Sequence, residues 1–150
     1  VGSEMCIRDR ERTHMIKPIN KDILFLQQKA EPATQADTAV MRDLRDTMQA
    51  HQTDCAGMAA NMIGVNKRII IVNLGMTNLL MLNPIILKKS GKYETTEGCL
   101  SLPGERPCTR YKEITVEYQD ERMNKHVQQF SGWVSEIVQH EMDHLEGILI

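Results

Sequence analysis

The sequence of 150 residues contains few aromatic residues and no long hydrophobic run. It has one Trp, three Tyr and two Phe against ten Met, which predicts an aliphatic and adaptable core. No run of 18 apolar residues is present, so no membrane-spanning helix is expected. No apolar segment before a small-residue cleavage site indicates a secretory signal. These absences favour a cytoplasmic protein with no membrane partner.

An excess of charge of one sign is also missing. The 18 Lys and Arg residues nearly balance the 20 Asp and Glu residues, and no basic block occurs. Direct binding to nucleic acid is therefore not expected. The four cysteines, Cys6, Cys55, Cys99 and Cys108, form no CxxC pair, and a chain of this length can bury a core without disulfides. We expect them to be thiols.

The first fourteen residues are charged and show no periodic pattern, and Met15 opens a segment that is typical of an ordinary start. We interpret residues 1–14 as a non-native or disordered extension. Residues 15–150 are expected to form one catalytic domain.

Apolar periodicity predicts a helix over residues 35–52, after a start signal at Thr34 and Asp37. Its apolar residues are Val40, Met41, Leu44 and Met48. Residues 90–107 are expected to form a turn-rich segment, and Pro84 to mark an edge or break in a strand. The expected strands cover residues 68–74, 79–87, 111–120 and 125–130.

A second helix, over residues 131–146, carries polar residues at positions that its apolar pattern marks as buried. One face is predicted to hold Trp133, Ile137, His140, Glu141 and His144. Within HEMDH, the two imidazoles lie one helical turn apart and can reach one ion, with Glu141 beside the open coordination position. This pattern indicates metal-assisted hydrolysis.

Two imidazoles do not complete a catalytic metal site, so a third ligand is required. The longer pattern HExxHxxGxxH ends here at Ile150, which cannot bind a metal. The ligand must therefore come from upstream. Cys99 in EGCLS is the best candidate, because a thiolate is a strong ligand for soft metals and this turn-rich segment can bring it to the helix. Cys55 and Cys108 are rivals without a comparable context.

Three segments together resemble the peptide deformylase family. GMAANMIG at 57–64 is similar to its first motif, EGCLS at 97–101 matches the second, and QHEMDHLEG at 139–147 matches the third. The resemblance covers residues 15–150. It implies an α+β fold with antiparallel sheets packed around a central HExxH helix, and removal of the N-formyl group from the starting methionine of new proteins.

Carried over by position, the resemblance implies Cys99, His140 and His144 as ligands of one divalent metal ion. The family commonly uses Fe²⁺, while Zn²⁺ or Ni²⁺ would also suit this ligand set. Glu141 is implied as general base and then acid, and the backbone N–H of Leu100 as an oxyanion donor. Arg106 falls at a position that in the family contacts the substrate peptide. Ile137 is a candidate for the pocket of the methionine side chain, with plain core packing as the alternative. The further candidate substrate contacts are Gly57, Met58, Asn61 and Met62.

Met62 departs from the family, which carries a glutamine there that donates to the developing oxyanion. A thioether cannot donate a hydrogen bond. Three interpretations are open: a slower deformylase that relies on the metal and Leu100, a loop shift that lets Asn61 donate, or a protein that binds nascent N-termini with deformylation weak or lost. A different HExxH hydrolase such as a peptidase is a further alternative.

The expected partners are N-formylmethionyl peptides and nascent chains, with the ribosome as a possible further partner. Many relatives continue into another helix associated with ribosome docking, and here only six residues follow His144. We therefore leave ribosome contact open at this point.

Overall fold

The computed structural model of the chain describes residues 16–150, so the expectation for residues 1–14 lies outside the described residues. Within residues 16–150, no helix is both long and apolar enough to cross a membrane. In chain order the elements are α2 (Ile23–Leu26), η1 (Gln35–Asp37), α3 (Thr38–Ala50), β1 (Gly57–Ala59), η2 (Ala60–Ile63), β2 (Ile69–Asn73), β3 (Asn78–Cys99), β4 (Leu102–Gln119), β5 (Lys125–Ser131) and α4 (Gly132–Leu145).

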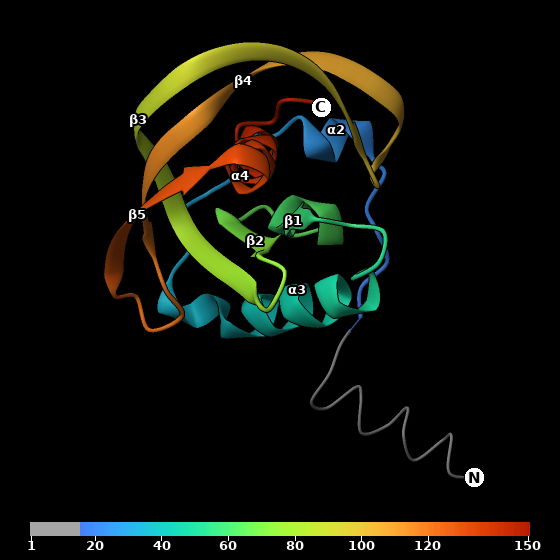
Figure 1. The fold of residues 1–150 in the computed structure, drawn as a ribbon. Helices are drawn as coiled ribbons and strands as arrows, with labels where there is room; N and C mark the ends of the chain where they lie inside the picture. The colour runs from blue at the N-terminus through green and yellow to red at the C-terminus, as the bar shows by residue number, and fades with distance from the viewer. Residues whose placement is uncertain (1–15) are drawn as a thin grey trace, which may run out of the picture.

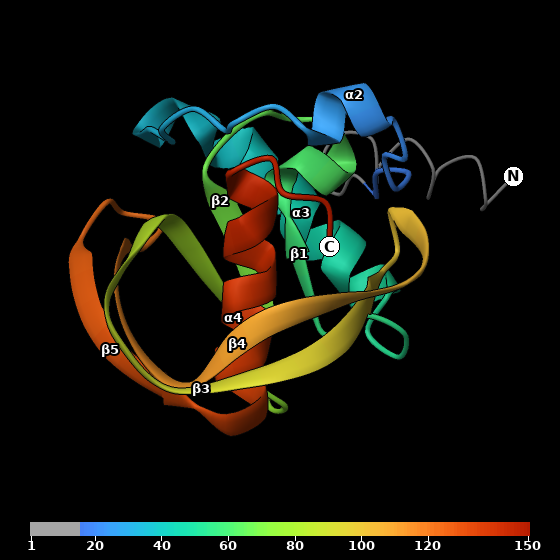
Figure 2. The same cartoon turned by 90° about the horizontal axis from the view of Figure 1, so that it is seen from above.

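The five strands form one antiparallel sheet in which every strand pairs with its neighbour in the sequence. The long strands β3 and β4 bend over α4, which lies in the middle of the molecule (Figures 1 and 2). The α+β fold with a central HExxH helix is thereby confirmed, although one continuous sheet replaces the several sheets that we expected.

Strand β2 is covered on both faces, which explains its unbroken apolar run. Ile70 and Val72 belong to a buried cluster with Ile137 and Val138 of α4. The alternate residues of β2, Ile69 among them, belong to a second cluster that includes residues of α3. The first layer of the sheet therefore lies between the two long helices, with α3 on the side opposite α4 (Figure 1).

Helix α3 begins close to the predicted start. The Thr34 side chain accepts a hydrogen bond from the Ala36 N–H at 3.2 Å, and the Asp37 side chain accepts one from the Thr34 N–H at 2.8 Å. These reciprocal bonds satisfy backbone donors that a helix start leaves unpaired. The start signal read from the sequence is confirmed.

The prediction of a turn-rich segment at 90–107 is wrong. Most of it belongs to a two-stranded ribbon in which β3 pairs with β4 from Ser90 opposite Glu113 to Gly98 opposite Glu105. Most side chains along this part of β3 are exposed. The two strands satisfy each other's backbone groups, so the ribbon does not need the apolar pattern on which strand prediction depends.

The break predicted at Pro84 is confirmed. The pairing of β3 with β4 shifts register between Leu82 and Ile85, and Asn83 has a positive φ of 51°. Asn83 also uses its side chain to accept from the Ala33 N–H at 2.8 Å and to donate to the Ala33 carbonyl at 3.0 Å. These contacts compensate for the irregular backbone at the bulge.

The expected inward position of Trp133 is wrong, because 66% of its side chain is exposed. Trp133 lies in the first turn of α4, where the helix emerges from β5 at the edge of the curved sheet. The other residues of the predicted face, Ile137, His140, Glu141 and His144, are buried.

We expect Gly147→Ala to destabilise the protein more than Gly64→Ala. Both glycines have positive φ, 76° and 84°, which costs an alanine about 1–2 kcal/mol. A Cβ at Gly147 would also lie 2.2 Å from the Gln27 carbonyl oxygen, whereas nothing lies within 4 Å of one at Gly64. Urea unfolding of both variants measures the difference, and equal losses would contradict the predicted clash.

Candidate metal centre and active site

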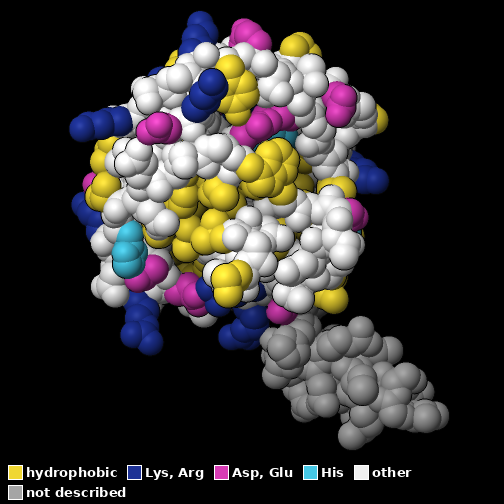
Figure 3. Space-filling model, viewed as in Figure 1, with side chains coloured by type: hydrophobic (Ala, Val, Ile, Leu, Met, Phe, Trp, Pro, Cys, Tyr) yellow, Lys and Arg dark blue, Asp and Glu magenta, His cyan; other side chains and the backbone are white. Residues whose placement is uncertain are grey.

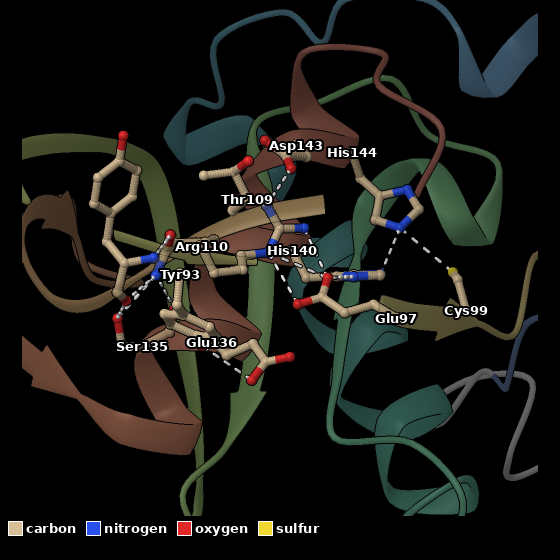
Figure 4. A network of polar contacts seen from close by, with 12 residues as sticks. Tyr93, Glu97, Cys99, Thr109, Arg110, Ser135, Glu136, His140, Asp143 and His144 are labelled. Atoms are coloured by element: carbon tan, nitrogen blue, oxygen red, sulfur yellow. Dashed lines mark hydrogen bonds and ion pairs between the residues drawn. The ribbon is translucent and has the colours of Figure 1, made fainter. Parts of the chain in front are cut away.

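One group of side chains among the described residues has the composition and spacing of a metal site: Cys99, His140 and His144. Their possible ligand atoms all lie within 4.8 Å of one another. Cys99 ends β3, and the two histidines lie one turn apart on α4. Figure 4 shows the three side chains turned toward one another.

The distances fit a tetrahedral cation. Cys99 Sγ lies 3.4 Å from His144 Nε2, which lies 3.2 Å from His140 Nε2. Bonds of about 2.3 Å to sulfur and 2.0 Å to nitrogen place tetrahedral ligand atoms about 3.3–3.5 Å apart. A thiolate with two imidazoles is also a donor set that suits zinc and iron. The residues present therefore fit one divalent metal ion.

Glu97 orients the first histidine of the pair. Its Oε1 lies 2.7 Å from His140 Nδ1, so the proton is held on that nitrogen and Nε2 is turned toward the ligand group. Arg110 donates to both oxygens of Glu97, at 2.7 Å and 3.0 Å, and to Asp143 at 2.7 Å. This chain of contacts, drawn in Figure 4, fixes the ring of His140 through two buried charges.

The environment lowers the pKa values of Glu97 and His144, for different physical reasons. Burial works against the ionised form of Glu97, but hydrogen bonds from His140 and Arg110 outweigh it and hold the pKa well below its usual value. Burial, with a contribution from the charge of His140, lowers the pKa of His144 to about 3. Glu97 is therefore an anion near neutral pH and His144 a neutral imidazole, the form that binds metals.

Glu141 faces a cavity of about 540 Å³ that also contains Cys99 and His140 in its wall. Its side chain is 4% exposed and its Oε1 has no hydrogen-bond partner among the described residues. Burial raises the pKa of Glu141 to about 7. A carboxyl group with a pKa near neutrality can both accept and return a proton, which suits a general base and acid.

Gly57 lets the backbone of β1 approach α4 at the wall of this cavity. A Cβ on Gly57 would lie 2.6 Å from Ile137 Cγ2 and 3.1 Å from Glu141 Oε2. Glycine is the residue that permits so close an approach. The small residue that opens GMAANMIG is therefore placed beside the proposed base.

Gly57, Met62, Leu100 and Ile137 line the cavity, whereas Met58, Asn61 and Arg106 are not among its lining residues. Met58 is fully buried in the core cluster on the α3 side of the sheet. The Asn61 side chain donates to the backbone carbonyl of His144 at 2.8 Å and is thus directed at the end of α4. Arg106 lies on β4 opposite Glu97 of β3.

Met62 reaches the cavity wall with its thioether already engaged. Its Sδ accepts the backbone N–H of Ala59 at 3.4 Å, and the residue is 1% exposed. The Met62 side chain therefore presents an apolar surface at the position where the family carries a hydrogen-bond donor. Neither of the two rival cysteines belongs to the group of facing ligand atoms. Cys55 lines this cavity, and Cys108 lines another cavity of about 460 Å³.

Sequence reasoning missed Arg110, Asp143 and Glu136. Tyr93 O–H donates to Glu136 Oε1 at 3.1 Å, and Glu136 lines the cavity with Trp133. A signal for Arg110 was present, because it shares the inward parity of Ile114 and Val116 along β4. A charge at a buried position of a strand indicates a partner or a site.

Comparison with known proteins agrees with this geometry. The family model for polypeptide deformylase matches residues 14–150. The chain belongs to the polypeptide deformylase family. A peptide deformylase of Clostridium beijerinckii is 55% identical over 136 residues, which cover 91% of this chain and 100% of the relative.

Solved peptide deformylases share the fold. The crystal structure from Thermus thermophilus has a TM-score of 0.79 at 34% identity, covering 89% of this chain and 83% of that one. A Met-Ala-Ser-bound peptide deformylase from Acinetobacter baumannii has a TM-score of 0.80 at 30% identity, covering 90% and 97%. The chain is accordingly a metal-dependent hydrolase that removes N-formyl groups from nascent proteins.

We expect Arg110→Met to destabilise this deformylase by about 3–5 kcal/mol, because it leaves the buried carboxylate of Glu97 without its cation. The matched control is Lys125→Met, which removes an exposed partner of Glu117 at 3.9 Å and should cost less than about 1 kcal/mol. Urea unfolding measures both free energies. Similar losses in the two variants would contradict a structural role for the buried pair.

Proposed function

We propose that Cys99, His140 and His144 hold the metal ion and that Glu141 moves the proton in deformylation. The observation that carries this proposal is that all four lie together, with Glu141 and two of the three ligands in the wall of one cavity. When bound, the cation would polarise the formyl carbonyl and lower the pKa of the attacking water.

Glu141 is assigned both proton steps. The carboxylate first takes a proton from the attacking water, and the resulting carboxylic acid then gives this proton to the departing amine. Burial and a pKa of about 7 support both roles, because neither form of the side chain is strongly favoured at neutral pH. The products are formate and a peptide with a free N-terminus.

The backbone N–H of Leu100 is the donor that we assign to the charge developing on the formyl oxygen. Met62 cannot donate, and the Asn61 amide is engaged with His144. Leu100 lines the cavity directly after the ligand Cys99, which supports the assignment.

Ile137 is assigned to the pocket for the methionine side chain, together with the apolar thioether of Met62. Figure 3 shows one face of the molecule, on which hydrophobic side chains gather near the centre with charged side chains around them. The Met-Ala-Ser complex of the Acinetobacter relative supports a peptide that begins with methionine as the ligand. Gly57, which lets β1 approach Glu141, also lines this cavity.

We propose Fe²⁺ as the native ion, in keeping with the family and with the soft Cys/His/His donor set. Protein purified without air should contain iron in a ratio near one to the chain. Zinc or nickel in its place would change the assignment of the metal while leaving that of the ligands intact.

Formate release from formyl-Met-Ala-Ser tests the function. The protein, loaded with Fe²⁺ without air, should release formate, and treatment with a chelator should abolish the release. Unformylated Met-Ala-Ser should remain intact. Cleavage of its peptide bonds would favour a peptidase, and binding of the formylated peptide without product would favour a binding module.

The place of action follows from the substrate. N-formyl groups are carried by nascent chains, so we propose the cytoplasm and chains emerging from ribosomes as the setting. Sedimentation with ribosomes at low salt tests direct docking. Protein that stays in the supernatant would indicate that it meets its substrates in solution.

A further inference from the structure

His144 must carry its ring proton on the nitrogen that faces away from the ligand group. Its Nε2 lies 3.4 Å from Cys99 Sγ and 3.2 Å from His140 Nε2. A nitrogen that binds a metal is unprotonated, so the proton lies on Nδ1. In Figure 4 this second nitrogen of His144 points away from Cys99 and His140.

The two histidines differ in the hydrogen-bond partner of this second nitrogen, Nδ1. Nδ1 of His140 has the carboxylate of Glu97 at 2.7 Å. Nδ1 of His144 has no hydrogen-bond partner among the described residues, although the residue is 0% exposed. Metal-binding histidines nearly always donate from their other nitrogen, and buried polar groups are nearly always paired. An acceptor for His144 is therefore required.

Asn61 already contacts His144 and holds an unused acceptor. Its Nδ2 donates to the His144 carbonyl at 2.8 Å, while its Oδ1 has no partner among the described residues. Asn61 is also 0% exposed. The unpaired donor and the unpaired acceptor thus belong to two buried residues joined by a hydrogen bond.

Hydrogen bonds from Asn20 fix the position of Asn61. The Asn20 side chain donates to the Asn61 carbonyl at 3.2 Å, and the Asn20 N–H donates to the Met62 carbonyl at 2.6 Å. These bonds tie η2 to the segment before α2, while the Asn61 side chain ties it to the end of α4. Among the buried unpaired oxygens, that of Asn61 is singled out because its side chain already bonds the His144 carbonyl. The other buried oxygens without a partner among the described residues are Asn66 Oδ1, Asn78 Oδ1, Ser101 Oγ and Glu141 Oε1.

We propose that Asn61 is a positioning residue for His144: its Oδ1 accepts the Nδ1–H, directly or through one buried water, while its Nδ2 holds the His144 backbone. Asn61 would then do for His144 what Glu97 does for His140. The proposal rests on the proposed role of His144 as a metal ligand. It moves Asn61 from the substrate contacts to the support of the metal centre.

Zinc affinity of matched variants tests this role. Asn61→Leu keeps the branched shape in a somewhat larger side chain and removes both polar groups, whereas Asn61→Asp keeps an acceptor and loses the donor. We expect Asn61→Leu to bind zinc about 10–100-fold more weakly than the wild type, and Asn61→Asp to stay within about threefold. Asn20→Ala, which removes only the outer support, should also stay within about threefold.

Competition with a chelator measures the affinities, and thermal unfolding of the metal-free variants reports on structure. A wild-type affinity in Asn61→Leu would overturn the proposal. Equal weakening of Asn61→Leu and Asn61→Asp would also overturn it, because the donor or packing would then explain the effect. Wild-type protein that binds no zinc would instead defeat the proposed metal site.

A measurement on the wild type covers the case in which Asn61→Leu does not fold. In the zinc-loaded, ¹⁵N-labelled protein, we expect a slowly exchanging proton on Nδ1 of His144, with a nuclear Overhauser effect to the Asn61 side chain. His126, which is exposed on β5, provides the comparison for fast exchange. An unprotonated Nδ1, or exchange as fast as that of His126, would overturn the proposal.

Discussion

Cys99→Ala is expected to lose the metal ion and, with it, deformylation. The variant removes one of three ligands, and the effect should exceed the roughly 10–100-fold loss of affinity that follows removal of a hydrogen-bond partner of a ligand. Metal content after dialysis against a weak chelator measures the loss. Formate release should fall to that of the chelated wild type.

The other cysteines provide matched controls. Cys55 lines the same cavity, whereas Cys108 lies in the second cavity. Cys55→Ala and Cys108→Ala should each retain one metal ion per chain, because neither belongs to the group of facing ligand atoms. Retention of the metal by Cys99→Ala together with its loss from Cys55→Ala would assign the third ligand to Cys55.

The sequence pattern was sufficient to predict buried residues where burial follows the period of the helix or strand. The face of α4 was recovered for Ile137, His140, Glu141 and His144, and the apolar run of β2 matched a strand covered on both sides. These elements are predictable because their side chains enter the core at regular intervals. Trp133 has the same periodicity but lies in the first turn of α4, where the core ends.

The pattern was insufficient where contacts join distant segments. Arg110 meets Glu97 across the β3–β4 ribbon, and Asn61 meets His144 across 83 residues of sequence. The period of β4 marks Arg110 as buried but does not identify Glu97 as its partner, and no local period marks the contact between Asn61 and His144. The departure at Met62 was visible in the sequence, whereas the engagement of its sulfur by Ala59 was visible only in the fold.

Glu141→Gln is expected to lower kcat for formyl-Met-Ala-Ser by about 10²–10⁴-fold, which is the usual contribution of a general acid–base group. Glutamine has nearly the same shape, so it should fit the buried position beside Gly57 and Ile137. It cannot take a proton from water. Metal content and KM should change little, because Glu141 is not one of the facing ligands.

Glu105→Gln is the matched control for this variant. Glu105 lines the same cavity but is exposed on β4, so its kcat should stay within about threefold of the wild type. Both variants are to be compared at equal metal content, which separates proton transfer from metal loss.

A Glu141→Gln variant with wild-type kcat would require another base. A further candidate base in the wall of this cavity is Glu136, which is half-buried and accepts a hydrogen bond from Tyr93. It lies on α4 one turn before His140. If Glu141→Gln loses activity and Glu105→Gln keeps it, both proton steps are assigned to the carboxyl group of Glu141.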